Sequence, residues 1–176
     1  MVTVTAETSL SSSPDDAWVA LGRRETYFSF PGIARRAGSG SGTTLDHALD
    51  LPIVDRQEQT ATLTIGRAGK NGPRERRFTL RGELVTISGH WRLEPAGAGV
   101  RVHLTLDYDI AAPLKTLAVN TLRSRSPLPI RTDADTILSR AVDEFFETRF
   151  TEQAAAYCER LRERLEVARP PRTRRA

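Results

Sequence analysis

Apolar and polar residues alternate through the middle of the chain, and this two-residue period is typical of strands with one buried face. The longest example spans residues 88–110, where two alternating runs flank a Pro/Gly/Ala turn. Further alternating runs lie at residues 3–10, 44–53, 57–65 and 78–80. One-sided alternation predicts an antiparallel sheet with one dry face and one wet face. Another element must therefore cover the dry face.

The register of the long hairpin follows from matching its apolar faces, because a slip of one residue would turn them to the wrong side. Placing Leu93 opposite Val102 satisfies this requirement. It also sets Glu94 across from Arg101, whereas the alternative register opposes Arg101 to another arginine. Like charges directly opposite are unfavourable. We therefore predict the first register, with residues 95–99 as the loop.

Helical segments are predicted on either side of the strands. Ser13 followed by Pro14 and two aspartates is typical of a helix start, and residues 25–32 read as a second short helix or turn. A long helix is predicted for residues 133–167, with Thr132 as its N-cap. Its apolar positions recur every four residues, so the apolar stripe drifts around the helix. This suits a helix that lies diagonally across a curved sheet.

Composition places the chain among ordinary soluble proteins. It has 176 residues, of which 39% are hydrophobic and 27% charged, and we expect one domain at residues 1–168. No apolar run approaches the length of a membrane span, and the N-terminus lacks the pattern of a signal peptide. We therefore expect a cytoplasmic protein. The single cysteine, Cys158, excludes an internal disulfide and a zinc site built from several cysteines.

The net charge of +4 belongs to the C-terminal end. Residues 159–176 contain seven arginines and three glutamates, which accounts for the whole excess. We interpret residues 169–176 as a basic, disordered tail, because they have little apolar surface to bury. A basic end can also indicate nucleic-acid binding. The tail has no aromatic residues for stacking on bases, so this partner is not favoured.

The order of elements resembles the START-like, or SRPBCC, superfamily, which includes polyketide cyclases and birch-pollen-allergen-like proteins. The resemblance spans residues 3–165 and rests on "SSSPDDAWVAL" after the first strand, "HWRLEP…GVRVHLTLDYDI" in the hairpin and "SRAVDEFFETRFTEQAAAYCERL" in the final helix. It implies an α+β helix-grip fold. One curved antiparallel sheet of about six or seven strands would surround the long C-terminal helix, with two short helices after the first strand. The family likeness also implies a cavity between sheet and helix.

Residues 111–132 depart from this pattern as an insert before the final helix. They contain a candidate amphipathic helix, on which Leu114, Leu117, Ala118 and Leu122 share one face. The sequence does not indicate the role of this segment.

Candidate chemistry is sparse. The sequence has no phosphate-binding loop, no nucleophile motif and no convergent metal ligands, so we expect no metal and no cofactor. His90 and His103 fall on the wet face. His47 falls on the dry face among leucines, where desolvation favours the neutral imidazole, which can act as an acid or a base. Tyr108 also faces the dry side. For both residues the alternative is a structural side chain that is hydrogen-bonded in the core.

Further candidates for ligand contact come from the dry face, the short second helix and the final helix. Arg149 is either a ligand anchor or one half of a surface ion pair with Glu152. The aromatic residues near position 28 either gate a pocket or seal the core. The full candidate set is Tyr27, Phe28, Phe30, Leu49, Phe78, Ile87, Trp91, Leu104, Leu106, Val142, Phe145, Phe146 and Arg149.

Three functions are compatible with this sequence. We favour a protein that binds a small hydrophobic or polycyclic ligand in the cavity. The second is a polyketide cyclase or dehydratase-type enzyme, in which His47 and Tyr108 would transfer protons. The third is a non-catalytic interaction protein with a filled core. The resemblance does not choose among them, because one fold hosts many functions. The sequence does not indicate an oligomeric state.

Overall fold

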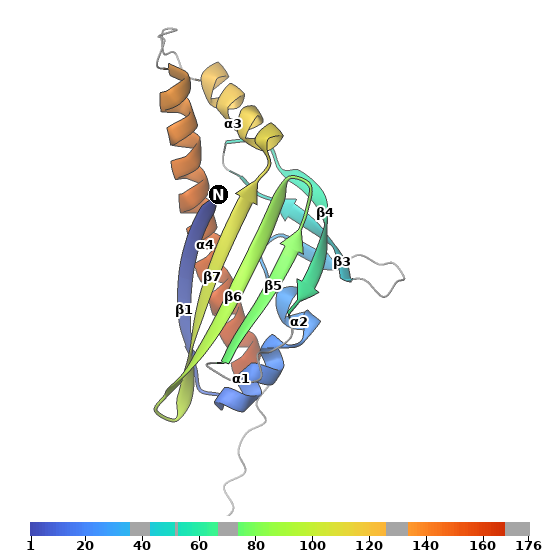
Figure 1. Ribbon diagram of the computed structural model, residues 1–176, viewed down its shortest axis with the longest axis vertical. Coiled ribbons are helices and arrows are strands. Elements are labelled where there is room, and N and C mark those ends of the chain that lie inside the picture. The colour runs from blue at the N-terminus through green and yellow to red at the C-terminus, as the bar shows by residue number, and fades with distance from the viewer. Residues whose placement is uncertain (36–42, 52, 67–73, 126–133, 168–176) are drawn as a thin grey trace, which may run out of the picture.

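The computed structural model describes residues 1–35, 43–51, 53–66, 74–125 and 134–167. In these ranges the chain forms a curled, seven-stranded antiparallel sheet whose concave side is crossed by one long helix (Figure 1). The predicted helix-grip fold is confirmed. The elements are β1 (Val2–Leu10), α1 (Pro14–Leu21), α2 (Arg24–Tyr27), β2 (Ile33–Arg35), β3 (Thr43–Leu49), β4 (Gln57–Ile65), β5 (Arg74–Arg81), β6 (Val85–Ala96), β7 (Gly99–Ile110), α3 (Ala112–Arg125) and α4 (Ala134–Val167).

The strands pair in the order β1-β7-β6-β5-β4-β3-β2, so β1 closes one edge of the sheet and the short β2 the other. In the β6–β7 hairpin Leu93 lies opposite Val102 and Glu94 opposite Arg101, which confirms the predicted register. The loop is shorter than the five residues predicted. Pairing continues to Ala96 and leaves a two-residue turn that begins at Gly97 with φ of 56°. Glycine at this first position is typical of a type II′ turn, which matches the twist of the strands.

α1 begins where the sequence predicts. Pro14 occupies the first turn, and the Ser13 hydroxyl accepts a hydrogen bond from the Asp16 backbone N–H at 3.1 Å. α2 folds back against the end of α1, because the Thr26 hydroxyl donates to the Ala20 carbonyl at 2.6 Å. The Tyr157 hydroxyl of α4 donates to the Thr26 carbonyl at 3.3 Å. α2 is therefore held between α1 and the final helix.

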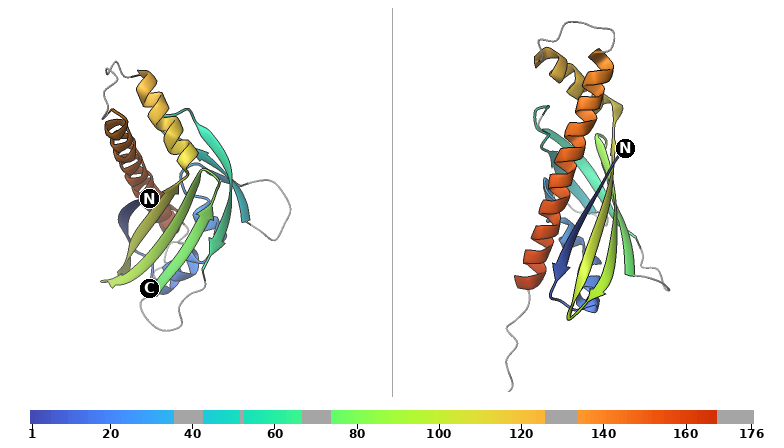
Figure 2. Two further views of the ribbon diagram at one scale, coloured as in Figure 1. Left: turned by 45° about the horizontal axis from the view of Figure 1, so that its top comes forward. Right: turned by 90° about the vertical axis from the view of Figure 1, so that its left-hand side faces the viewer.

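α4 is 34 residues long, which at about 1.5 Å per residue corresponds to about 50 Å. It crosses the concave side of the sheet diagonally and packs mainly against β1 (Figure 2). The predicted cap at Thr132 and the predicted basic tail at residues 169–176 lie outside the described residues. The four-spaced stripe predicted from the sequence is buried, and its members are Val142, Phe146, Phe150, Ala154 and Cys158.

The predicted amphipathic helix in the insert is present as α3, which runs beside the N-terminal part of α4 (Figure 1). Leu114 and Ala118 are buried, but Leu117 is 43% exposed, so the prediction that it shares the buried face is wrong. α3 has α4 as its main helical neighbour, and a single neighbouring helix covers only a narrow stripe. The Lys115 ammonium binds the Asp143 carboxylate at 2.7 Å and links the two helices.

No helix in the described part of the chain is long and apolar enough to cross a membrane.

Candidate functional site

A row of aromatic rings fills the space between α2, the sheet and the C-terminal half of α4. Phe78 and Trp91 come from neighbouring strands of the sheet, and Tyr157 reaches them from α4. Each ring contacts the next at centroid distances between 4.7 and 6.2 Å. In order of contact the rings are Tyr27, Phe78, Trp91, Tyr157, Phe30 and His47.

Beside this aromatic row lies an enclosed cavity with a volume of about 10 Å³. This is about enough for one water molecule, and the lining offers no polar surface to bind one. Side chains therefore fill nearly all of the space between α2 and this part of the sheet. We call this space the interior cavity; its lining residues are Tyr27, Phe30, Ile33, Leu45, Leu63, Phe78, Leu80 and Ile87.

The candidates for ligand contact that the sequence predicts divide into four groups. Phe28 is half-buried and packs against the core. Phe145 and Arg149 lie at the surface of α4. The candidates that line the interior cavity are Tyr27, Phe30, Phe78 and Ile87. Those that are buried in the surrounding core without lining the cavity are Leu49, Trp91, Leu104, Leu106, Val142 and Phe146.

Phe145 is 45% exposed, so its assignment to an inward-facing site is wrong. The neighbouring Phe146 is fully buried instead. The Arg149 guanidinium binds the Asp50 carboxylate at 2.5 Å and the Glu152 carboxylate at 3.0 Å. The predicted surface pair with Glu152 is therefore present, and Asp50 is an additional partner. These contacts join α4 to the end of β3, and Arg149 does not line the interior cavity.

His47 lies on β3 in the core and is only 2% exposed. Its Nδ1 atom accepts a hydrogen bond from the amide Nε2 of Gln59 at 3.1 Å, because an amide nitrogen can only donate. Burial lowers the pKa of His47 from 6.5 to about 4. The imidazole is therefore neutral at physiological pH, with its proton on Nε2. This arrangement corresponds to the structural alternative for His47.

We expect the fold to lose stability as the pH falls from about 6.5 to about 4, because the unfolded chain takes up a proton on His47 before the folded chain does. At about 1.4 kcal/mol per pKa unit the loss is about 3 kcal/mol. His47→Gln should remove most of it. Urea denaturation over this pH range measures the effect, with His103→Gln on the outer face as the control. A His47→Gln variant with an unchanged pH dependence would contradict this assignment.

Tyr108 lies on β7, and its ring stacks on Phe150 of α4 at a centroid distance of 3.8 Å and an interplanar angle of 5°. Its hydroxyl is buried without a hydrogen-bond partner among the described residues. Burial raises its pKa far above the ordinary value of 10.0. Tyr108 and His47 lie four strands apart in the sheet order and pack against different rings. The structure thus does not bring the two proposed proton-transfer groups together.

Two residues near the interior cavity were missed by the sequence reasoning. Gly89 lies opposite Phe78 in the sheet, and a Cβ atom at Gly89 would be 2.0 Å from the Phe78 ring. Glycine therefore lets the ring lie flat on the sheet. Arg76 is on the same face of β5 as Phe78, and its Cζ atom lies 4.4 Å from the centroid of the Trp18 ring. Counting back by two from Phe78 would have placed Arg76 on the inner face.

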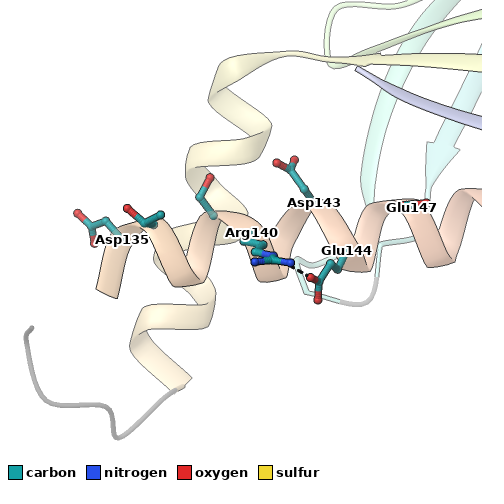
Figure 3. Close-up of a pocket in the computed structure, with 7 residues that line it drawn as sticks. Asp135, Arg140, Asp143, Glu144 and Glu147 are labelled. Carbon is teal, nitrogen blue, oxygen red and sulfur yellow. Dashed lines mark hydrogen bonds and ion pairs between the residues drawn. The ribbon is translucent and has the colours of Figure 1, made fainter. Parts of the chain in front are cut away.

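Larger hollows on the outside of the molecule are open and polar. One lies along the N-terminal half of α4, where Arg140 binds Glu144 at 3.2 Å (Figure 3). All its lining residues come from this single helix. Another lies on the outer face of the sheet, where His103 is placed between Glu7 and Glu94 at 3.4 and 3.3 Å. Within the described ranges no group of side chains is arranged to hold a metal ion. Unlike these hollows, the interior cavity is lined by apolar side chains.

Comparisons with known proteins agree with this architecture. No family model and no curated protein matches the sequence. Among solved structures, TTHA0849 from Thermus thermophilus matches with a TM-score of 0.57 and 17% identity, over 96% of this chain and 99% of that chain. A conserved protein from Geobacillus kaustophilus matches with a TM-score of 0.56 and 8% identity, over 95% and 97%. A START superfamily protein from Mycobacterium smegmatis gives 0.44 and 15%, over 86% and 96%. The two matches with TM-scores of 0.57 and 0.56 show that this chain shares its fold with those proteins.

Proposed function

We propose that this protein binds a small, mainly apolar molecule in the interior cavity, between the inner face of the sheet and α2. The observation that carries the proposal is the enclosed lining of eight side chains without polar surface. Sites for hydrophobic ligands are likewise lined mainly by apolar side chains. Because the cavity measures about 10 Å³, a ligand larger than a water molecule enters only when lining side chains move outward.

One wall of the cavity is suited to such movement. Phe30 lies in the turn between α2 and β2, and Ile33 is the first residue of β2, which is three residues long. β2 is an edge strand that pairs only with β3, and Ile33 is half-buried. β2 buries little apolar surface, and local opening is cheapest where such contacts are few. The opposite wall consists of the long strands β5 and β6, which we expect to stay in place.

The filled core also favours a second candidate, an interaction protein that binds nothing in its interior. In the first candidate a ligand enters the interior cavity, whereas in the second the protein's own side chains always fill it. A binding protein should accept an apolar probe and gain stability by mass action as the probe concentration rises. A protein with a permanently filled core should do neither. The cyclase hypothesis has no such support, because Tyr108 and His47 pack against different rings, Phe150 and Phe30.

We expect N-phenylnaphthylamine, a neutral fluorescent probe, to bind the wild-type protein, and Gly89→Ala to weaken this binding at least about tenfold, or about 1.4 kcal/mol. A Cβ at Gly89 would be 2.0 Å from the Phe78 ring, so the ring must shift into the interior cavity. Overpacking of this kind also costs about 1–3 kcal/mol of stability. Fluorescence titration measures the affinity, and urea denaturation measures the stability.

The matched control is Gly97→Ala. Gly97 has a φ of 56° and no atom within 4 Å of an added Cβ, so alanine strains the β6–β7 turn without touching the core. It should lower stability but leave probe affinity unchanged. Equal affinity of the wild type and Gly89→Ala would place the site elsewhere. No binding to the wild type, together with no extractable ligand in fresh preparations, would favour the interaction protein.

A further inference from the structure

Arg76 is an inward-facing cation at the end of the aromatic row. It pairs with Trp91 across β5 and β6 and precedes Phe78 on the inner face by one two-residue period. Its guanidinium lies between the Trp18 ring, 4.4 Å from the centroid to Cζ, and the backbone of Gly22. A Cβ atom at Gly22 would be 2.7 Å from the Arg76 Nη1 atom. The glycine thus makes room for the guanidinium against the end of α1.

Arg76 has no ion pair with any described residue. Arg74, two positions earlier in β5, binds the Asp15 carboxylate at 2.5 Å, and Glu75 binds His90. The Arg76 Nε atom is buried and has no hydrogen-bond acceptor in the described part of the chain. A guanidinium carries five N–H donors and is suited to paired hydrogen bonds with a planar anion. The Nε–H donor of Arg76 is therefore available to an acceptor that the described chain does not supply.

Tyr27 connects Arg76 to the interior cavity. The Tyr27 ring lines the cavity beside Phe78, at a centroid distance of 4.7 Å. Its hydroxyl donates to the Leu21 carbonyl at 2.9 Å, next to the glycine on which the Arg76 guanidinium lies. Burial raises the pKa of Tyr27 to about 12, and the positive charge of Arg76 opposes this rise. The cation and the cavity thus lie at the two ends of one tyrosine side chain.

We propose that the molecule bound in the interior cavity has one anionic end, a carboxylate or a sulfonate, and that Arg76 binds this end. The inference rests on the proposed function and specifies its ligand class as an apolar acid. The length of the ligand can be estimated along β5, because Leu80 in the cavity wall follows Arg76 by four residues. At about 3.3 Å per residue this separation is about 13 Å. A compact acid without an extended apolar part would not reach both ends.

The test compares two probes with the same ring system on the full-length protein. N-phenylnaphthylamine is neutral, and anilinonaphthalene sulfonate is its sulfonated counterpart. The wild type should bind the sulfonate at least about tenfold more tightly, and salt should reduce this preference because it screens charge. Arg76→Gln should remove the preference and leave the affinity for the neutral probe unchanged. Arg76→Lys should retain part of it, because a lysine keeps the charge but not the fork of donors.

Arg74→Gln is the matched control, because Arg74 lies on the same strand and already pairs with Asp15. It should leave both affinities unchanged, and a loss of the sulfonate preference in this variant would place the anion elsewhere. Equal binding of both probes by the wild type would overturn the inference alone. Equal weakening of both probes in Arg76→Gln and Arg76→Lys would show that Arg76 only fastens α1 through Trp18. Absence of binding by either probe would overturn the proposed function and the inference together.

Discussion

Replacing Phe150 by alanine should lower the free energy of unfolding by about 3–5 kcal/mol. Phe150 is 1% exposed, and its ring stacks on Tyr108 and contacts Phe146 at a centroid distance of 5.9 Å. Its removal leaves a cavity where α4 meets β7 and takes away the stacking partner of Tyr108. Urea denaturation followed by circular dichroism measures the change.

Phe145→Ala is the control for this experiment, on the same helix and with the same chemical change. Phe145 is 45% exposed, so most of its surface is in water in the folded protein and its loss should cost less than about 1 kcal/mol. Similar losses for the two variants would show that α4 is rotated relative to the sheet. Such a result would also remove the reason for excluding Phe145 from the site.

The two phenylalanines illustrate what helical periodicity can and cannot predict. The four-residue spacing through Phe146 and Phe150 identified the stripe that faces the sheet, because a buried stripe requires apolar residues at one helical period. It did not decide on which side of the stripe Phe145 lies. The width of the buried face depends on the neighbours of α4, and the N-terminal half of α4 has α3 as its neighbour. Periodicity within one helix carries no information about that neighbour.

The same limit applies to the candidate site. Alternation correctly placed Phe78 and Ile87 on the dry face. It predicts to which side of the sheet a side chain points, but not the volume of a cavity on that side. The volume depends on how rings pack, and the Phe78 ring lies where Gly89 leaves the sheet without a side chain. Arg76 was missed because residues 66–75, rich in glycine and charge, read as a loop that ended just before it. In the structure β5 already begins at Arg74.

Gln59 replaces strand pairing at the place where β4 passes the turn between β5 and β6. Its Oε1 atom accepts hydrogen bonds from the backbone N–H groups of Leu84 and Val85 at 2.9 and 3.1 Å. Its Nε2 atom donates to the Val85 carbonyl at 3.0 Å and to His47 at 3.1 Å. Gly82 makes room for this amide, because a Cβ there would be 2.2 Å from Oε1. The Gln59 side chain thus accepts hydrogen bonds from this stretch of backbone and also donates one to it.

Gln59→Leu should therefore lower the free energy of unfolding by more than about 2 kcal/mol, because a buried donor without a partner costs about 1–3 kcal/mol and this change leaves two donors without acceptors. Exchange of the Leu84 and Val85 amide protons should accelerate in the same variant. The control is Gln57→Leu on the same strand, whose exposed side chain makes one bond to the Asp55 carbonyl and should change stability by less than about 0.5 kcal/mol. Unchanged protection of both amides in Gln59→Leu would show that water or another side chain satisfies them, and that Gln59 does not hold β4 to β6.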